Sequence, residues 1–190
     1  TTMETFCYAA MFRGCTSLTE APELSATTLA GGCYSEMFEN CTSLETAPTL
    51  SATTLPNRCY DQMFSGCTKL NQVKVAFTEW TSSTTYNWLK DVAPKGIIIC
   101  PDELGTETRG VSNVPEGWSV NGYEISVSAV GWASMYLPID VTIPEDVEVY
   151  YAASASGDVV TLKSIADAIP AHTGVIVKAA EGTVFFPYTT

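Results

Sequence analysis

Apolar residues recur through the first part of the chain with the spacing of a helical face. They stand at positions i, i+3, i+4 and i+7, first as Tyr8, Met11, Phe12 and Cys15. This spacing is typical of one side of an α-helix, which turns once in about 3.6 residues. A helix stop is expected near Gly14, because glycine tolerates the left-handed conformation in which many helices end. The pattern therefore predicts a short helix in this stretch.

An extended segment is predicted directly after this helix. In "TSLTEAPEL" the apolar residues Leu18, Ala21 and Leu24 point inward, and Pro22 keeps the segment from becoming a long strand. Strands stack about 4.8 Å apart, whereas helices need about 10 Å. A stack of such helix-plus-strand units must therefore curve, with its strands on the concave side.

The whole pattern returns every 26 residues, as the steps from Cys7 to Cys33 and from Cys33 to Cys59 show. A fixed period in this range is the mark of a stacked-repeat architecture. Repeats are assigned to residues 7–32, 33–58 and 59–84, which are called the first, second and third repeat below. Residues 1–6 are assigned to the tail of an earlier repeat, so the chain is expected to continue toward the N-terminus. Residues 85–118 are assigned to a degenerate copy that caps the repeats.

The remaining residues, 119–190, have a different texture. Short segments such as "YEISVSAV" and "TGVIVK" alternate apolar with polar residues, and turn residues such as Gly131 and Pro144 separate them. Several short strands of this kind predict a small antiparallel, sandwich-like β domain. The expected fold class is therefore an α/β solenoid of one helix and one strand per repeat, followed by a small all-β domain.

The consensus "CYxxMFxxCTSLTxAPxLxATTL" resembles the BspA-like leucine-rich repeats of cell-surface proteins from gut and oral Bacteroidetes. The resemblance covers residues 1 to about 118 and includes the endings "WLKDVAPKG" and "VPEGW". It implies a leucine-rich-repeat horseshoe displayed outside a bacterial cell. It also implies an adhesive or binding surface without catalytic machinery.

Charge narrows the possible partners. Nine basic residues face 21 acidic ones, which gives a formal net charge of −12. This field repels a phosphate backbone and an anionic membrane surface, so neither is an expected partner. The chain has no apolar stretch of about 18 residues that would span a bilayer.

The periodic cysteines allow three interpretations: zinc ligands, disulfides or buried free thiols. Zinc sites use close clusters such as C-x-x-C, whereas Cys7 and Cys15 are eight positions apart. Across a helix these two residues would also lie beyond the Cα separation that a disulfide allows. Free thiols in the core are therefore expected, with no cofactor and no metal.

Positions that vary between the repeats mark the predicted ligand-binding surface. They lie beside the predicted strand, on the concave side where stacked repeats often bind ligands. A plain solvated face is the alternative interpretation. The candidate ligand-binding residues are Thr19, Glu20, Glu23, Glu45, Thr46, Thr49, Asn71 and Gln72.

Catalysis is not expected. His172 is the single histidine, it stands in the turn-like "IPAHTG", and no G-x-S-x-G sequence accompanies it. The leading hypothesis is a cell-surface adhesion protein whose repeats contact a host or neighbouring-cell protein. A structural stalk is one alternative, and a glycan-binding accessory module is another. In the glycan-binding module the ligand would meet exposed aromatic residues, such as Trp118, Trp132, Tyr150 or Tyr151.

Overall fold

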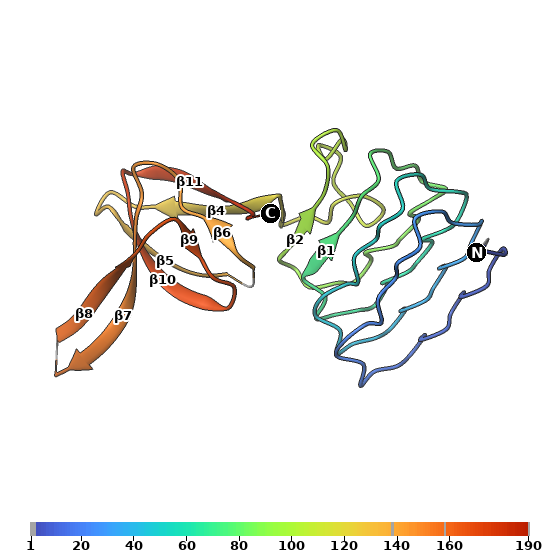
Figure 1. The fold of residues 1–190 in the computed structure, drawn as a ribbon, viewed down its shortest axis with the longest axis horizontal. Coiled ribbons are helices and arrows are strands. Elements are labelled where there is room, and N and C mark those ends of the chain that lie inside the picture. The colour runs from blue at the N-terminus through green and yellow to red at the C-terminus, as the bar shows by residue number, and fades with distance from the viewer. Residues whose placement is uncertain (1–2, 138, 158, 190) are drawn as a thin grey trace. The chain divides into compact units, whose positions relative to one another are not determined.

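The structure is a computed structural model that describes residues 3–137, 139–157 and 159–189. Residues 1 and 2 of the predicted 1–6 tail lie outside the described residues. The chain divides into two compact units, Thr1–Val120 (unit 1) and Asn121–Thr190 (unit 2). Within the described ranges, the regular secondary structure consists of β-strands without a helix (Figure 1). The prediction of an α/β leucine-rich-repeat solenoid is therefore wrong.

Consecutive turns occupy the stretch where the helix was predicted. Backbone N–H groups alternate between two kinds of acceptor along it. Met11 N donates to Tyr8 O at 3.4 Å, inside the same repeat, whereas Tyr8 N donates to Cys33 O at 3.0 Å, in the next repeat. Every fourth residue has a positive φ, and these residues are Phe6, Ala10, Gly14, Gly32, Glu36, Asn40, Arg58, Gln62 and Gly66.

The distance between repeats explains why turns replace the helix. The ring centroids of Phe12 and Phe38 lie 5.5 Å apart, and those of Phe38 and Phe64 lie 5.6 Å apart. Packed helices stay 8–10 Å apart, because each helix uses its own N–H groups internally. The turns instead release every second N–H group to the neighbouring repeat. Hydrogen bonds between repeats therefore draw the backbones closer than helices could approach.

The equivalent aromatic residues of the three repeats form stacked columns. Rings of the Phe12–Phe38–Phe64 column lie within 3° of parallel, as do those of Tyr34 and Tyr60. These phenylalanines are therefore neighbours in one continuous apolar interior, as the 26-residue spacing of their positions indicates. Most of the core of unit 1 comes from the second and third repeats, including Met37, Cys41, Leu44, Met63, Cys67 and Leu70.

A short parallel sheet follows the turns. Its strands are β1 (Gln72–Lys74), β2 (Gly96–Ile99) and β3 (Trp118–Val120), in the order β1-β2-β3. Isolated bridges join Thr46 to Gln72 and Leu50 to Val75, so the extended segment of the second repeat lies beside that of the third.

The C-terminal end of the repeat stack is capped. Leu89 N donates to Val111 O at 3.1 Å, and Asn87 N donates to Ser112 Oγ at 2.9 Å. The buried Trp88 indole donates from Nε1 to Asn113 O at 3.1 Å. Residues 111–113 thus take up donors that would otherwise point out of the stack, as expected for a terminal unit.

Unit 2 consists of antiparallel strands, and this is compatible with the predicted sandwich-like domain. Its sheets have the orders β5-β10-β7-β8, β11-β4 and β6-β9. The strands are β4 (Gly122–Val127), β5 (Trp132–Leu137), β6 (Val141–Thr142), β7 (Glu148–Ser156), β8 (Val159–Ile165), β9 (Ala168–Ile169), β10 (Thr173–Lys178) and β11 (Gly182–Pro187). The described residues include no helix that is long and apolar enough to cross a bilayer.

All seven cysteines lie among the described residues and are free thiols. The thiols of the second and third repeats are buried, but Cys7 and Cys15 of the first repeat are exposed. The prediction of buried core thiols is therefore wrong for these two residues. The argument against a disulfide used the Cα separation of Cys7 and Cys15 along a helix. Since this stretch is not a helix, that argument does not apply.

Alkaline pH is expected to destabilise unit 1. Burial raises the pKa of the Cys59 and Cys67 thiols from 9.0 to about 12. The folded state then holds these protons more tightly than the unfolded chain does. The contribution to stability is therefore complete below about pH 9 and is lost as the pH rises toward about 12. Urea unfolding under reducing conditions should give a lower midpoint at pH 10.5 than at pH 8. An unchanged midpoint would contradict this prediction.

Candidate functional site

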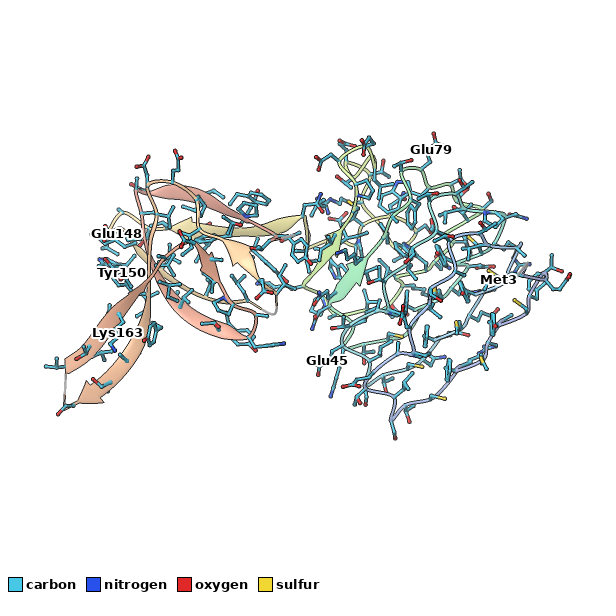
Figure 2. The ribbon with its side chains drawn as sticks, in the orientation of Figure 1. Met3, Glu45, Glu79, Glu148, Tyr150 and Lys163 are labelled. Carbon is cyan, nitrogen blue, oxygen red and sulfur yellow. The ribbon has the colours of Figure 1, made fainter. Side chains whose placement is uncertain are left out.

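The structure brings together part of the predicted ligand-binding residues of unit 1. Thr46 pairs with Gln72 in a parallel bridge, and Asn71 N donates to Glu45 O at 2.9 Å. Gln72 O in turn accepts from Ala47 N at 2.9 Å. These contacts align the second and third repeats, and Figure 2 marks the place of Glu45.

The other predicted residues of unit 1 are solvated. Thr19, Glu20, Glu23 and Thr49 are exposed. Among the described residues, no backbone hydrogen bond links Thr19 or Glu20 to the second repeat. The predicted ligand-binding residues thus include exposed polar and acidic groups of the first and second repeats. Their role in binding a ligand stays a prediction.

A second candidate surface lies on the four-stranded sheet of unit 2. Cross-strand neighbours in this sheet are Trp132 with Lys178, Tyr136 with Gly174, and Tyr150 with Ile176. Residues in register on neighbouring strands point to the same side of a sheet, and alternate residues along a strand share a side. This register places Trp132, Ser134, Tyr136, Glu148, Tyr150, Gly174, Ile176 and Lys178 on one side, which we call the aromatic face.

An ordered set of contacts holds one edge of the aromatic face. The ring centroids of Trp132 and Tyr150 lie 5.9 Å apart, and Lys178 Nζ lies 5.9 Å from the Trp132 ring centre. Lys178 Nζ also donates to Glu148 Oε1 at 2.6 Å, and the Tyr150 hydroxyl donates to Glu148 Oε2. Figure 2 shows Glu148 and Tyr150 close together on β7. These four side chains therefore fix one another.

The charges at this edge stay in place at neutral pH. The hydrogen bond from Lys178, followed by that from Tyr150, lowers the pKa of Glu148 below its usual 4.5. The same contact with Glu148 raises the pKa of Lys178 and of Tyr150. The carboxylate is ionised and the lysine protonated, so the edge presents hydrogen-bond acceptors and donors side by side.

An open hollow of about 460 Å³ lies in the middle of the aromatic face. Gly174 forms part of its floor, and a Cβ atom added there would meet no atom within 4 Å. Tyr136, which is 61% exposed, stands beside it, and its hydroxyl lies 3.1 Å from Nδ1 of His172. The hollow is lined by Ser134, Met135, Tyr136, Ala152, Gly174, Val175 and Ile176.

The aromatic residues named from the sequence fall in different places. Trp132 and Tyr150 belong to the aromatic face, whereas Trp118 is buried in unit 1 and donates from Nε1 to Ala93 O at 2.8 Å. Tyr151 follows Tyr150 directly and points to the opposite side of the sheet. Sequence reasoning missed Tyr136, although the alternation in "WASMYL" places it on the same side as Trp132.

Metal binding and catalysis gain no support from the geometry. Within the described ranges, no group of three or more His, Cys, Asp or Glu residues could hold a metal ion. His172 is exposed in a turn with φ of 58°, and its hydrogen-bond partner is Tyr136 rather than an acid. Comparisons of the chain with protein-family models, curated proteins and solved structures found no match.

Proposed function

We propose that this chain is a non-catalytic binding protein of a bacterial cell surface, and that unit 2 binds carbohydrate through its aromatic face. The cell-surface location rests on the sequence resemblance. The ligand class rests on the aromatic face itself, where Tyr136 lines an open hollow and Trp132 and Tyr150 stand at a charged edge of the same side of the sheet. Contact with glycans on host or neighbouring cells would make the protein an adhesin.

The chemistry of a sugar matches both parts of the aromatic face. One side of a pyranose ring carries C–H groups, which pack on the electron-rich face of an aromatic ring. Its hydroxyl groups both donate and accept hydrogen bonds, as do the groups that Glu148, Tyr150 and Lys178 offer. The hollow at Gly174 lets a ligand approach the backbone of β10. Exposed aromatic residues gathered in this way are typical of a binding surface.

The experiment that tests this proposal is a glycan array probed with the full chain and three variants. Trp132→Ala should lower the affinity for any bound glycan by more than about fivefold, since truncating an aromatic anchor commonly costs more than about 1 kcal/mol of binding energy. Gly174→Trp should also abolish binding, because the new side chain would fill the hollow. A Cβ atom at Gly174 meets no atom within 4 Å and the backbone there is not left-handed, so the new side chain starts from open space. Circular dichroism of the variant checks that it is folded.

Tyr151→Ala is the matched control. The variant removes an exposed tyrosine of β7, next to Tyr150 but on the opposite side of the sheet, and it should bind glycans like the unchanged protein. Equal glycan binding by the unchanged chain and by Trp132→Ala would contradict the proposal. So would binding to purified matrix proteins with no response from the glycan array.

A further inference from the structure

The hydrogen bonds between the turn segments of successive repeats run in one direction, whereas those between the extended segments run in both. In each turn segment, alternate N–H groups donate to carbonyl groups of the repeat that follows in the sequence. Phe12 N donates to Met37 O at 2.9 Å, Phe38 N to Met63 O at 2.9 Å, and Phe64 N to Trp88 O at 3.0 Å. The turn segment of each repeat therefore presents donors on its C-terminal side and acceptors on its N-terminal side.

The equivalent acceptors of the first repeat have no donor among the described residues. In the second repeat, the equivalent carbonyl groups all accept hydrogen bonds from the first repeat; they belong to Cys33, Ser35, Met37 and Glu39. Within the described residues, no hydrogen bond reaches the corresponding carbonyl groups of the first repeat, which belong to Cys7, Ala9, Met11 and Arg13.

The apolar side chains of the first repeat are uncovered on the same side. Met11 is 59% exposed, whereas its equivalent Met37 is 2% exposed. Tyr8 is 41% exposed, and its equivalent Tyr34 is 3% exposed. A hollow of about 310 Å³ opens among these side chains and Phe12. The first repeat thus covers the N-terminal side of the second repeat. The N-terminal side of the first repeat carries the equivalent side chains and is open to solvent.

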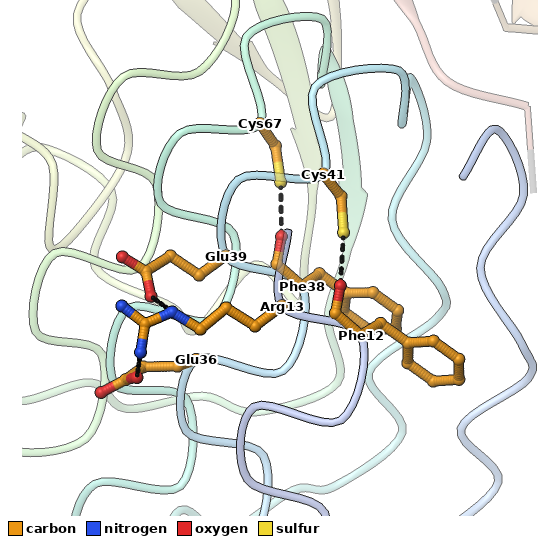
Figure 3. Close-up of polar contacts among 7 residues, drawn as sticks. All are labelled: Phe12, Arg13, Glu36, Phe38, Glu39, Cys41 and Cys67. Carbon is orange, nitrogen blue, oxygen red and sulfur yellow. Dashed lines mark hydrogen bonds and ion pairs between the residues drawn. The ribbon is translucent and has the colours of Figure 1, made fainter. Parts of the chain in front are cut away.

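The cysteine column shows the same gap. Cys41 Sγ donates to Phe12 O at 3.1 Å, and Cys67 Sγ donates to Phe38 O at 3.0 Å, each in the preceding repeat (Figure 3). Cys15 holds the equivalent position in the first repeat, and its thiol is exposed. One more repeat on this side would offer the carbonyl group that Cys15 lacks.

Charge specifies which repeat fits. Arg13 contacts Glu36 at 2.8 Å and Glu39 at 2.7 Å in the second repeat (Figure 3). Glu36 and Glu39 stand 26 residues after Ala10 and Arg13. In a repeat added before the first one, the residue at the position of Arg13 would therefore face Ala10 and Arg13. An incoming repeat with an acidic residue here, as Glu39 is in the second repeat, would meet Arg13 and attract it. An incoming arginine would be repelled.

We propose that the N-terminal side of the first repeat is a docking surface for one further 26-residue repeat that carries an acidic residue at the position of Glu39. Two interfaces of the same kind already exist in the chain, between the first and second repeats and between the second and third, so the surface continues an established interface. A second copy facing it with its own first repeat would bring acceptors against acceptors. The donors at the far end of the stack are occupied by residues 111–113.

The test adds a repeat to the full chain. A copy of residues 33–52 placed directly before Thr1 restores the 26-residue spacing, because residues 1–6 correspond to 53–58. The two copied cysteines are changed to serine, and Cys7→Ser is introduced so that Cys15 is the exposed thiol of the repeats. Thiol labelling of Cys15 under native conditions is expected to be at least tenfold slower than in the same variant without the added copy, because the site then reacts only after local opening.

Two control extensions make the outcome specific. A copy in which the glutamate corresponding to Glu39 is arginine should protect Cys15 less, and salt should reduce the difference. A scrambled extension of the same composition should leave the labelling rate unchanged. The proposal is overturned if the added copy does not slow labelling, or if the scrambled extension slows it equally. Protection of Cys15 that rises with the concentration of the unextended chain would assign the surface to a second copy instead, which also overturns it.

Discussion

Replacing Phe38 by alanine is expected to lower the free energy of unfolding of unit 1 by about 3–5 kcal/mol. Phe38 is fully buried, and its ring is stacked between Phe12 on one side and Phe64 on the other. Removing it would leave a cavity in the middle of the column, and the hydrogen bonds between repeats would prevent its neighbours from closing that cavity. Urea denaturation followed by near-ultraviolet circular dichroism measures the loss.

Phe12→Ala is the matched control for this prediction. Phe12 holds the equivalent position one repeat earlier and is partly buried, and among the described residues its ring stacks on that of Phe38 alone. Its replacement should cost less than half as much as that of Phe38, since water can fill the space left behind. Equal losses for the two variants would contradict the view that the second repeat is the centre of the core.

Gly96→Ala is expected to destabilise unit 1 by about 1–3 kcal/mol, the usual cost of overpacking a core. A Cβ atom at this position in β2 would lie 2.5 Å from Asn71 O and 2.6 Å from the ring of Trp118. The first atom belongs to the backbone and the second to a buried side chain, so neither can move away freely. The three-stranded sheet would have to separate to admit one methyl group.

Gly174→Ala tests whether the loss of stability expected for Gly96→Ala comes from the lack of space at Gly96 or from replacing any glycine in a strand. Gly174 also lies in a strand, but a Cβ atom there meets nothing within 4 Å. Thermal unfolding should show no loss of stability for this variant, and strand propensity favours alanine slightly over glycine. A loss for Gly174→Ala as large as that for Gly96→Ala would show that the close approach at Trp118 is not the cause.

The repeat period was readable from the sequence, but the conformation of each repeat was not. The 26-residue spacing correctly placed Phe12, Phe38 and Phe64 in one column. Spacing of i, i+3, i+4 and i+7 does not distinguish a helix from four-residue turns, because both return a side chain to nearly the same side after four residues. Gly14, Asn40 and Gly66 are residue types that favour a positive φ, which is also typical of a helix end. In the structure, a positive φ recurs at every fourth residue of each turn segment, and these three positions are the last in each segment.

The candidate site was predictable in part for a similar reason. Alternation along "WASMYL" and "VEVYYA" places Trp132 and Tyr136 on one side of a strand and separates Tyr150 from Tyr151. Which strands are neighbours depends on pairing between distant segments, such as β10 with both β5 and β7. Local patterns do not contain that information. The contact of Lys178 with both Trp132 and Glu148 therefore emerged only from the structure.

The uniform direction of the hydrogen bonds between the turn segments has an electrostatic consequence for unit 1. In these segments, alternate peptide groups have their C=O bonds directed toward the first repeat and their N–H bonds toward the third. Their dipoles therefore add along the axis of the stack, as they do along a helix, rather than cancelling. The N-terminal end carries partial negative charge on open carbonyl oxygens, in a chain whose net charge is already −12. Cations should gather at that end of unit 1 in preference to the other.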